Sequence, residues 1–229
     1  MKYITAEEAT ELDKQLMSED SGWSLDQLME LAGLAVACAV HRATHGVPCT
    51  VLVIAGPGNN GGDGLVAARH LQLFGYTTEV YIPKKKGGIY SRLLNQLIGL
   101  GIVIHDSVDY SIGDGYGYIV DAIFGFSFSG DVRAPFDRTI NELSQTRIPV
   151  LSVDAPSGWH IEDGQPAAGK VGANFYPTAL ISLSAPKPCS RHFRGRHFLG
   201  GRFLSEQFMR NYELPSYPGT DQIVELTGL

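Results

Sequence analysis

Cysteine is scarce in this sequence, and its few positions exclude two classes of protein. Cys38, Cys49 and Cys189 have neither the spacing of metal ligands nor that of a redox pair, and their odd number argues against a disulfide framework. Unreactive thiols of this kind fit a reducing compartment. We therefore expect a cytoplasmic protein, with the mitochondrion as the alternative compartment.

The sequence also lacks long apolar runs and an excess of positive charge. No run is long enough to cross a membrane, and residues 1–4 lead directly into a predicted helix, so we expect neither a signal peptide nor a membrane partner. The formal net charge is −6, which is opposite in sign to the field of a nucleic-acid-binding protein. We therefore expect no nucleic-acid partner.

The apolar residues that are present follow two periods. The 229 residues are 44% hydrophobic and 18% charged, which suits one domain, spanning 1–229, with a large core. Short β-branched runs alternate with segments of helical spacing. This alternation predicts a Rossmann-like α/β fold, a three-layer α/β/α sandwich around a mostly parallel central sheet. Strands are expected at 50–54, 78–82, 102–104, 118–120, 149–153 and 178–183, and helices at 5–16, 24–45, 64–75, 91–100 and 135–145.

Capping boxes mark the starts of the first two helices. Thr5 is followed three residues later by Glu8, and Ser24 is followed three residues later by Gln27. The second of these helices has apolar residues on more than one face. This indicates burial against the sheet and a surface for a partner subunit.

Two basic segments lie outside the predicted core. Residues 191–195 and 196–200 are copies of a five-residue pattern, which we expect to form a turn that leads into an edge strand at 202–204. For the arginines here, a solvated edge is favoured over a phosphate site. Lys84–Lys86 follow a predicted strand and leave the same two alternatives open.

A glycine-rich stretch at 55–64 connects the first predicted strand to a helix that the spacing predicts to begin at Gly64. Glycines allow backbone N–H groups to approach a ligand, and the helix N-terminus favours anions. Asn59, Asn60 and Asp63 add amide and carboxylate groups that a purely structural turn does not require. We therefore interpret this stretch as a ligand-binding loop.

A conventional nicotinamide-dependent oxidoreductase is disfavoured as an explanation of this loop. Such a site places an acidic residue at the end of the next strand. Here the only acid, Glu79, lies inside that strand, and lysines follow it. A serine hydrolase is also disfavoured, because Ser157 lies outside any nucleophile-elbow pattern.

Polar residues follow three predicted strands. The groups are Asn59–Asp63, Asp121–Asp131 and Asp154–Gly158. Ligands of open parallel sheets bind outside the carboxyl ends of the strands. Because these three ends share one edge of the sheet, the sequence predicts one pocket that collects all three groups.

These residues resemble a known family. The segments GPGNNGGDG (56–64), VDAIFGFSFSG (120–130) and VDAPSGW (153–159), with SLDQLMELAG (24–33) before them and LISLSAPKPC (180–189) after them, closely resemble the NAD(P)HX epimerases. These form the YjeF N-terminal domain family, which includes the apolipoprotein A-I-binding protein. Nearly the whole chain is covered. The resemblance implies a nicotinamide-nucleotide repair enzyme that interconverts the R and S forms of NADHX and NADPHX, upstream of a separate ATP- or ADP-dependent dehydratase.

The resemblance also implies site residues. One potassium ion per subunit would be held by Asn60, Asp121 and Ser157. Ser129 stands where many eukaryotic relatives have lysine, so a charge available to a phosphate in those relatives is missing here. The implied substrate contacts are Asn59, Asn60, Gly61, Gly62, Asp63, Gly125, Phe126, Ser127, Phe128, Ser129, Gly130, Asp131 and Asp154.

Asp154 is the predicted acid/base catalyst. The reacting carbon of the substrate is a hemiaminal, which inverts either through loss and return of water or through ring opening and closure. Both routes need proton transfer at its hydroxyl. Asp121 is expected to hold a cation that keeps the loops in register, and Phe126 and Phe128 are equally suited to core packing and to contact with a ring.

A non-catalytic module is the main alternative function. A similar domain serves for dimerisation in an mRNA-decapping scaffold protein that lacks epimerase activity. The presence of Asn60, Asp121, Asp154 and Ser157 favours the enzyme. A homodimer, formed through the N-terminal helices, is what the resemblance implies for assembly.

Overall fold

An eight-stranded sheet runs through the centre of the molecule. The computed structural model describes residues 1–226, and the strand order in this part of the chain is β3-β2-β1-β4-β5-β6-β7-β8. All neighbouring strands are parallel except β7 and β8, which are antiparallel. The strands are β1 (Thr50–Ala55), β2 (Thr77–Tyr81), β3 (Val103–His105), β4 (Tyr118–Ala122), β5 (Val150–Val153), β6 (Ala179–Leu183), β7 (Arg196–Gly200) and β8 (Ile223–Leu226).

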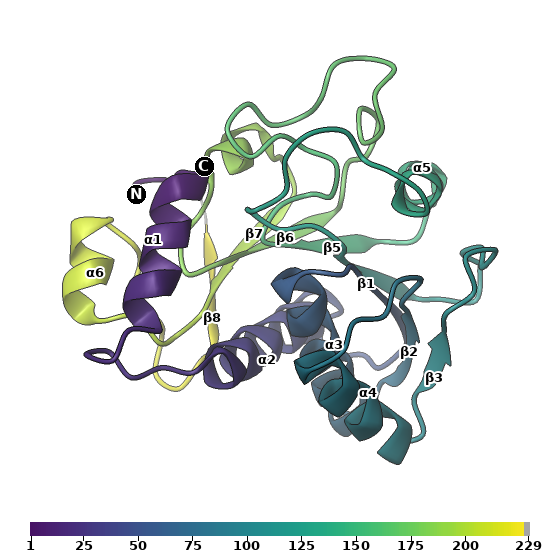
Figure 1. Ribbon diagram of the computed structural model, residues 1–229, viewed down its shortest axis with the longest axis horizontal. Coiled ribbons are helices and arrows are strands. Elements are labelled where there is room, and N and C mark those ends of the chain that lie inside the picture. The colour runs from purple at the N-terminus through teal and green to yellow at the C-terminus, as the bar shows by residue number, and fades with distance from the viewer. Residues whose placement is uncertain (227–229) are drawn as a thin grey trace.

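Helices cover both faces of the sheet (Figure 1). α2, α3 and α4 pack on one face, and α5 packs on the other, where α1 and α6 cover the end formed by β7 and β8. The predicted α/β sandwich with a mostly parallel sheet is confirmed. The helices are α1 (Ala6–Leu16), α2 (Leu25–Ala43), α3 (Asn59–Leu73), α4 (Ile89–Gly99), α5 (Phe136–Gln145) and α6 (Glu206–Asn211), with a short 3-10 helix η1 (Pro188–His192) before β7.

The apolar runs of the central strands are buried on both sides because helices cover both faces. In β1, Val51 and Val53 belong to the core beneath α2 and α3, whereas Leu52 and Ile54 belong to the core beneath α5. This alternation is the two-residue period of a strand. In the described residues, no helix has the length and apolar character needed to span a membrane.

Both predicted capping boxes are confirmed. Thr5 accepts a hydrogen bond from the Glu8 N–H while the Glu8 side chain accepts one from the Thr5 N–H, and Ser24 and Gln27 form the same reciprocal pair at the start of α2.

The predicted edge strand at 202–204 is wrong. The second five-residue copy, 196–200, is itself strand β7, and the first copy lies in η1 and the turn after it. The edge of the sheet is β8, which pairs antiparallel with β7. Arg196 binds Glu225 of β8 through both carboxylate oxygens, at 2.8 and 2.9 Å. The arginine therefore joins two strands. The partner strand of β7 is separated from it by α6 and a turn, so a local pattern does not reveal the pairing.

The predicted start of α3 at Gly64 is also wrong. The helix begins at Asn59, so Gly61, Gly62 and Gly64 lie in its first two turns. Glycine has a low helix propensity, which is why the sequence indicated a loop. Close packing is the reason for glycine here. A Cβ atom on Gly61 would lie 1.9 Å from the carbonyl oxygen of Gly56.

Tyr90 fixes the turn that leads into α3. Its buried hydroxyl lies against the carbonyl oxygens of Gly56 and Gly58, and it donates to the Gly56 oxygen at 2.7 Å. Burial raises the pKa of Tyr90. The hydroxyl therefore remains a donor at neutral pH and holds the turn against α4.

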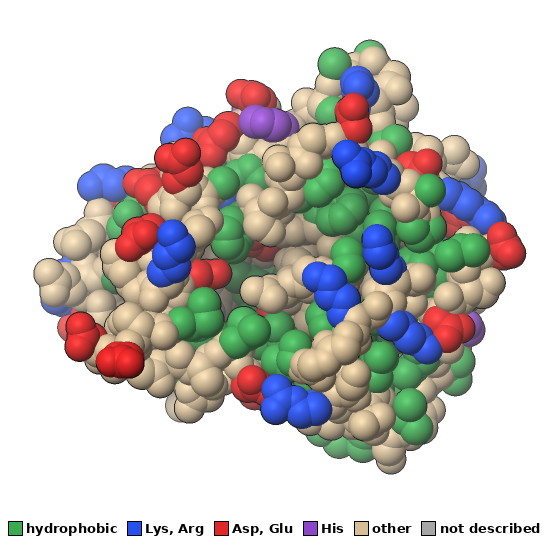
Figure 2. Space-filling view, in the orientation of Figure 1, with side chains coloured by type: hydrophobic (Ala, Val, Ile, Leu, Met, Phe, Trp, Pro, Cys, Tyr) green, Lys and Arg blue, Asp and Glu red, His purple; other side chains and the backbone are tan. Residues whose placement is uncertain are grey.

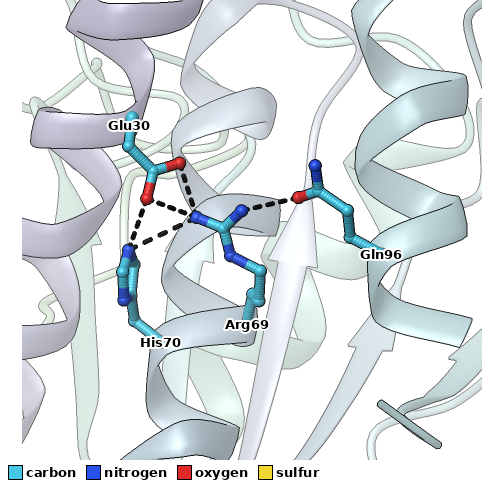
Figure 3. Close-up of polar contacts among 4 residues, drawn as sticks. All are labelled: Glu30, Arg69, His70 and Gln96. Atoms are coloured by element: carbon cyan, nitrogen blue, oxygen red, sulfur yellow. Dashed lines mark hydrogen bonds and ion pairs between the residues drawn. The ribbon is translucent and has the colours of Figure 1, made fainter. Parts of the chain in front are cut away.

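A polar cluster on the outer surface joins three helices (Figure 3). Glu30 of α2 binds Arg69 of α3 and lies 2.8 Å from the Nε2 atom of His70. Arg69 reaches on to Gln96 of α4 at 2.6 Å. Although burial opposes the change, the hydrogen bonds from Arg69 and His70 lower the pKa of Glu30. The cluster joins α2 and α4 to the C-terminal half of α3.

We predict that Gly61→Ala destabilises the protein strongly, by about 3 kcal/mol or more, because the new methyl group would meet backbone that has no room to move. Gly58→Ala is the matched control. No atom lies within 4 Å of a Cβ built there, so its free energy of unfolding should stay within about 1 kcal/mol of the parent. Urea unfolding measures both, and equal stability of the two variants would contradict the packing argument.

We predict that His197 makes the protein less stable in acid. Burial, followed by the charge of Lys187, lowers the pKa of His197 to about 4. Below pH 6.5 the unfolded chain binds a proton here that the folded chain refuses until about pH 4. Stability contributed by this histidine is therefore lost as pH falls through that window, by on the order of 3 kcal/mol.

His197→Gln tests this dependence, because glutamine retains a polar contact with Ser182, whose Oγ lies 2.8 Å from the histidine Nε2. The difference in unfolding free energy between pH 7 and pH 4.5 should be smaller in the variant. An unchanged difference would assign the acid sensitivity to other groups.

Candidate functional site

A cavity of about 550 Å³ opens at the carboxyl ends of β1, β4, β5 and β6. Residues from α1, α2 and the start of α3 form its other walls. Figure 2 shows the hollow near the middle of one face, with acidic side chains inside it and basic side chains along its right-hand side. Its polar lining residues include Asp13, Asn59, Asn60, Asp63, Lys86, Ser127, Asp154, Ser184 and Lys187.

Asp154 lies at the inner end of this cavity, directly after β5. Its side chain is buried. The Oδ2 atom accepts a hydrogen bond from the Phe126 N–H at 2.8 Å, and the Oδ1 atom accepts one from Lys187. The residue has a φ of +69°, an unusual conformation for a residue with a side chain. Asp154 is therefore held firmly and presents a carboxylate to the cavity.

Lys187 is a site residue that the sequence analysis missed. It is 2% exposed. Its ammonium group pairs with Asp154, donates to the Leu183 carbonyl at 2.8 Å and lies 5.5 Å from the centre of the Phe126 ring. A buried lysine that reaches a cavity is rare and is compensated by a partner charge.

A repeated turn carries Asp154 and Lys187 into the cavity. Residues 154–157 read Asp-Ala-Pro-Ser and residues 184–187 read Ser-Ala-Pro-Lys. Asp154 and Ser184 both have positive φ, +69° and +65°. The N–H of each donates to the neighbouring strand, Asp154 to Ile181 at 2.7 Å and Ser184 to Gly200 at 3.0 Å. This repeat is the sequence signal that could have identified Lys187.

Asp121 lies in β4 at the centre of a second polar network. It is fully buried, and its carboxylate accepts hydrogen bonds from the hydroxyls of Ser152 at 2.7 Å and Ser157 at 2.6 Å. The N–H groups of Ser157 and Ile123 add two more, at 3.0 and 3.3 Å. Burial raises the pKa of Asp121, and the hydrogen bonds from Ser157 and Ser152 oppose this change.

The segment after β4, residues 123–131, is called the second loop. Ser157 links this network to the second loop, because its Oγ atom accepts a hydrogen bond from the Phe124 N–H at 3.1 Å. The predicted pair Asp121 and Ser157 is therefore in direct contact. Ser152, which completes the network, was not singled out in the sequence because it lies within a buried strand.

Asn60 lies on the first turn of α3 and lines the cavity. It is 8% exposed, and its Nδ2 atom has no hydrogen-bond partner in the described residues. A Cβ on Gly125 would lie 3.1 Å from Asn60 Oδ1 and 3.2 Å from Asp154 Oδ2. Glycine at position 125 therefore lets these two side chains approach each other across the second loop.

Two further carboxylates face the cavity. Asp63 comes from α3 and Asp13 from α1. Burial and then the charges of Asp154 and Asp13 raise the pKa of Asp63 well above its ordinary value, against the opposing charge of Lys187. Burial also raises the pKa of Asp13. The sequence analysis missed Asp13, because α1 is far along the chain from the segments that follow the strands.

The second loop divides between two hollows. Gly125, Phe126, Ser127 and Phe128 line the cavity described above. Ser129, Gly130 and Asp131 instead line an adjacent hollow of about 570 Å³, where Asp131 pairs with Lys170 at 3.0 Å. Phe128 lines both hollows and stacks on Phe124 with a 4.3 Å separation of ring centres.

The structure thus brings most predicted site residues to one place. Asn59, Asn60, Asp63, Asp154 and the first part of the second loop share the cavity. Gly61 and Gly62 do not line it and pack against Gly56 and against Met29 of α2. The predicted cation ligands Asp121 and Ser157 do not line it either, because both are fully buried. Phe126 both lines the cavity and packs on core residues, so both alternatives considered for it apply.

Such an arrangement can bind an elongated anionic ligand and move a proton. The first N–H groups of α3 have no partners within the helix and lie where an anion is favoured. Lys86 lines the same cavity. Asp154 supplies a fixed carboxylate, and the apolar walls of the cavity strengthen its interactions.

Comparisons with known proteins agree with this geometry. The chain is 52% identical to the NAD(P)H-hydrate epimerase of Aspergillus fumigatus, a match covering 99% of this chain and 96% of the relative. It is 48% identical to the protein of that name from Schizosaccharomyces pombe, covering 98% and 95%. The crystal structure of yeast ynu0 superposes with a TM-score of 0.90 at 41% identity and covers 99% of this chain and all of that one.

A family profile gives the same assignment over most of the segments that build the cavity. The profile described as YjeF-related protein N-terminus matches residues 25–189, from the start of α2 through the turn that carries Lys187. The chain therefore belongs to the YjeF-related N-terminal family.

Proposed function

We propose that this protein is an NAD(P)H-hydrate epimerase, an isomerase that interconverts the R and S epimers of NADHX and NADPHX. The observation that carries the proposal is the near-complete coverage of relatives bearing that name at about half identity. The cavity supports it, since its volume of about 550 Å³ lies within the usual range for small-ligand sites. A nucleotide substrate would account for both the N-terminus of α3, which favours anions, and the carboxylate of Asp154 in the same cavity.

Asp154 is the proposed acid/base. The substrate carbon bears a hydroxyl group and a ring nitrogen, so its configuration inverts when either the C–O bond or the C–N bond breaks and re-forms. A proton must leave or reach the hydroxyl oxygen in both routes. Asp154 would accept and return that proton, and the proposal is supported by its carboxylate, which lines the cavity and is held by Phe126 and Lys187.

The rest of the cavity is proposed to bind the nucleotide. The N–H groups of Asn59 and Asn60 at the α3 N-terminus, with Lys86 on the rim, suit the pyrophosphate. Phe128 has a ring on the wall of the cavity and suits stacking on a base or the nicotinamide. Ser129, Gly130 and Asp131 would contact a part of the substrate that extends into the adjacent hollow.

A potassium ion is the proposed cofactor. Asp121 is a buried carboxylate, and no basic side chain in residues 1–226 pairs with it. Asn60 has an unpartnered amide nitrogen, and rotation of that amide presents its oxygen instead. Carboxylate, amide and hydroxyl oxygens suit this ion, so the residues fit. Asp121, Asn60 and Ser157 would hold it, and it would supply positive charge that keeps the loops after β4 and β5 together.

A homodimer and a downstream dehydratase complete the proposal. On α2, Leu31, Leu34 and Cys38 are only partly buried, which leaves apolar surface for a second copy. The epimerase would supply an ATP- or ADP-dependent dehydratase with the one epimer that it accepts. The cytoplasm is the proposed compartment, with the mitochondrion as the alternative.

We predict that the protein restores a mixture of epimers when it is given purified R- or S-NADHX, and that Asp154→Asn lowers turnover by about 10²- to 10⁴-fold. Chromatography of the two epimers over time measures the rate. Asp106→Asn is the matched control, because this exposed carboxylate pairs with Lys85 outside both hollows, and its turnover should remain within about threefold of the parent. Nucleotide binding without any change in the epimer ratio would contradict the proposed enzyme activity and favour the non-catalytic module.

We also predict that potassium stabilises the folded protein. At a concentration ten times its dissociation constant, K⁺ should add about 1.4 kcal/mol, which raises the melting temperature by about 3–6 °C in a chain of this size. Tetramethylammonium chloride at equal ionic strength is the comparison.

Ser157→Ala should remove most of the potassium effect, whereas Ser129→Ala should retain it. The same melting temperature in both salts for the parent protein would contradict the cation site. An equal response of the two variants would place the ion elsewhere.

A further inference from the structure

The buried ammonium group of Lys187 pairs with the carboxylate of the proposed catalyst, Asp154. Lys187 is 2% exposed and lines the cavity. The backbone of Lys187 is held in place, because its carbonyl accepts hydrogen bonds from the Ser190 N–H at 3.0 Å and the Ser190 hydroxyl at 2.7 Å. The lysine therefore projects from a rigid turn at the start of η1.

Stability alone gives a weak reason for this ion pair. Removing two charges from water costs several kcal/mol, and apolar residues of similar size often serve as well or better. The neighbourhood is apolar on one side, where Phe126 and the cluster around Ala155, Trp159 and Cys189 pack. Apolar residues at both positions would suit these neighbours, so the reason for the pair is sought in the carboxylate that Asp154 presents to the cavity.

The charges around Asp154 suggest that role. Asp13 from α1 and Asp63 from α3 face the same cavity and both interact with Asp154 by like-charge repulsion. Lys187 is the basic group whose charge acts on both of them as well as on Asp154. Without it, the carboxylate of Asp154 would face two other acids with no positive partner, and the repulsion would turn it away from its present orientation.

The two oxygens of Asp154 have different partners. Lys187 holds Oδ1, and the Phe126 N–H on the second loop holds Oδ2 at 2.8 Å. Together they fix the plane of the carboxylate. Lys187 also donates to the Leu183 carbonyl at 2.8 Å. The orientation of the Asp154 carboxylate therefore depends on the end of β6 as well as on β5.

We propose that Lys187 is a positioning residue for epimerisation, which holds the Asp154 carboxylate aimed at the substrate hydroxyl. The inference rests on the proposed epimerase function. Lys187 acts through Asp154, so it should affect the rate of the chemical step more than the binding of the nucleotide. A misplacement of about 1 Å in a catalytic group can cost 10²-fold in rate.

The test compares Lys187→Met, Lys187→Gln and Lys187→Arg in the full-length protein with R-NADHX as substrate. Lys187→Met should lower kcat by roughly 10²-fold and change KM by less than about threefold. Glutamine keeps a donor without the charge, so a loss of about tenfold is expected. Arginine keeps both charge and donor and should recover most of the rate.

Lys85→Met is the matched control, because it breaks an exposed ion pair, with Asp106 at 2.6 Å, by the same substitution. Its kcat should equal that of the parent. Lys187→Met added to Asp154→Asn should cost little further rate, since no carboxylate remains to be positioned.

Circular dichroism establishes which variants fold. If Lys187→Met does not fold, Lys187→Gln decides, and a folded glutamine variant with the parental kcat would overturn the inference. A fall in kcat that is matched by an equal rise in KM, or full additivity with Asp154→Asn, would overturn it too. Absence of epimerisation by the parent protein would instead refute the proposed function.

Discussion

A buried ion pair between Asp154 and Lys187 is the interaction on which the cavity depends. The two residues come from turns after neighbouring strands, β5 and β6, and neither charge can be buried without the other. The turns must therefore form together, and each contains a residue with positive φ that bonds to the next strand. This coupling places one carboxylate at a defined point of the cavity wall.

Two polar networks lie close together at this edge of the sheet and have different surroundings. The Asp121 network lies inside the protein, where hydroxyl and N–H donors from Ser152, Ser157 and Ile123 bind its carboxylate. The Asp154 network is open to the cavity. Asp121 therefore joins the segments that follow β4 and β5, whereas the carboxylate of Asp154 lies on the wall where a ligand can reach it.

Much of the site could be inferred from the sequence, because parallel strands end at the same edge of a sheet. Asn60, Asp63 and Asp154 were brought together on that argument alone. The inference failed where local and tertiary preferences oppose each other. Glycine disfavours a helix, yet Gly61 and Gly64 lie inside α3 because Gly56 and Ala122 leave no room for side chains. Lys187 escaped notice because lysine is normally exposed, although the repeated Ala-Pro turn marked its position.

By itself the sequence determined strands β1–β6 and the presence of helices α1–α5, where the two capped helices begin, and which polar groups follow the strands. These properties depend on near neighbours in the chain, and the apolar period records them directly. Tertiary structure alone decided that β8 covers β7, that α3 starts at Asn59, and that Lys187 and Asp13 share a cavity with Asp154. Each of these depends on contacts between residues far apart in the chain, whose free energy outweighs local propensity and leaves no local pattern.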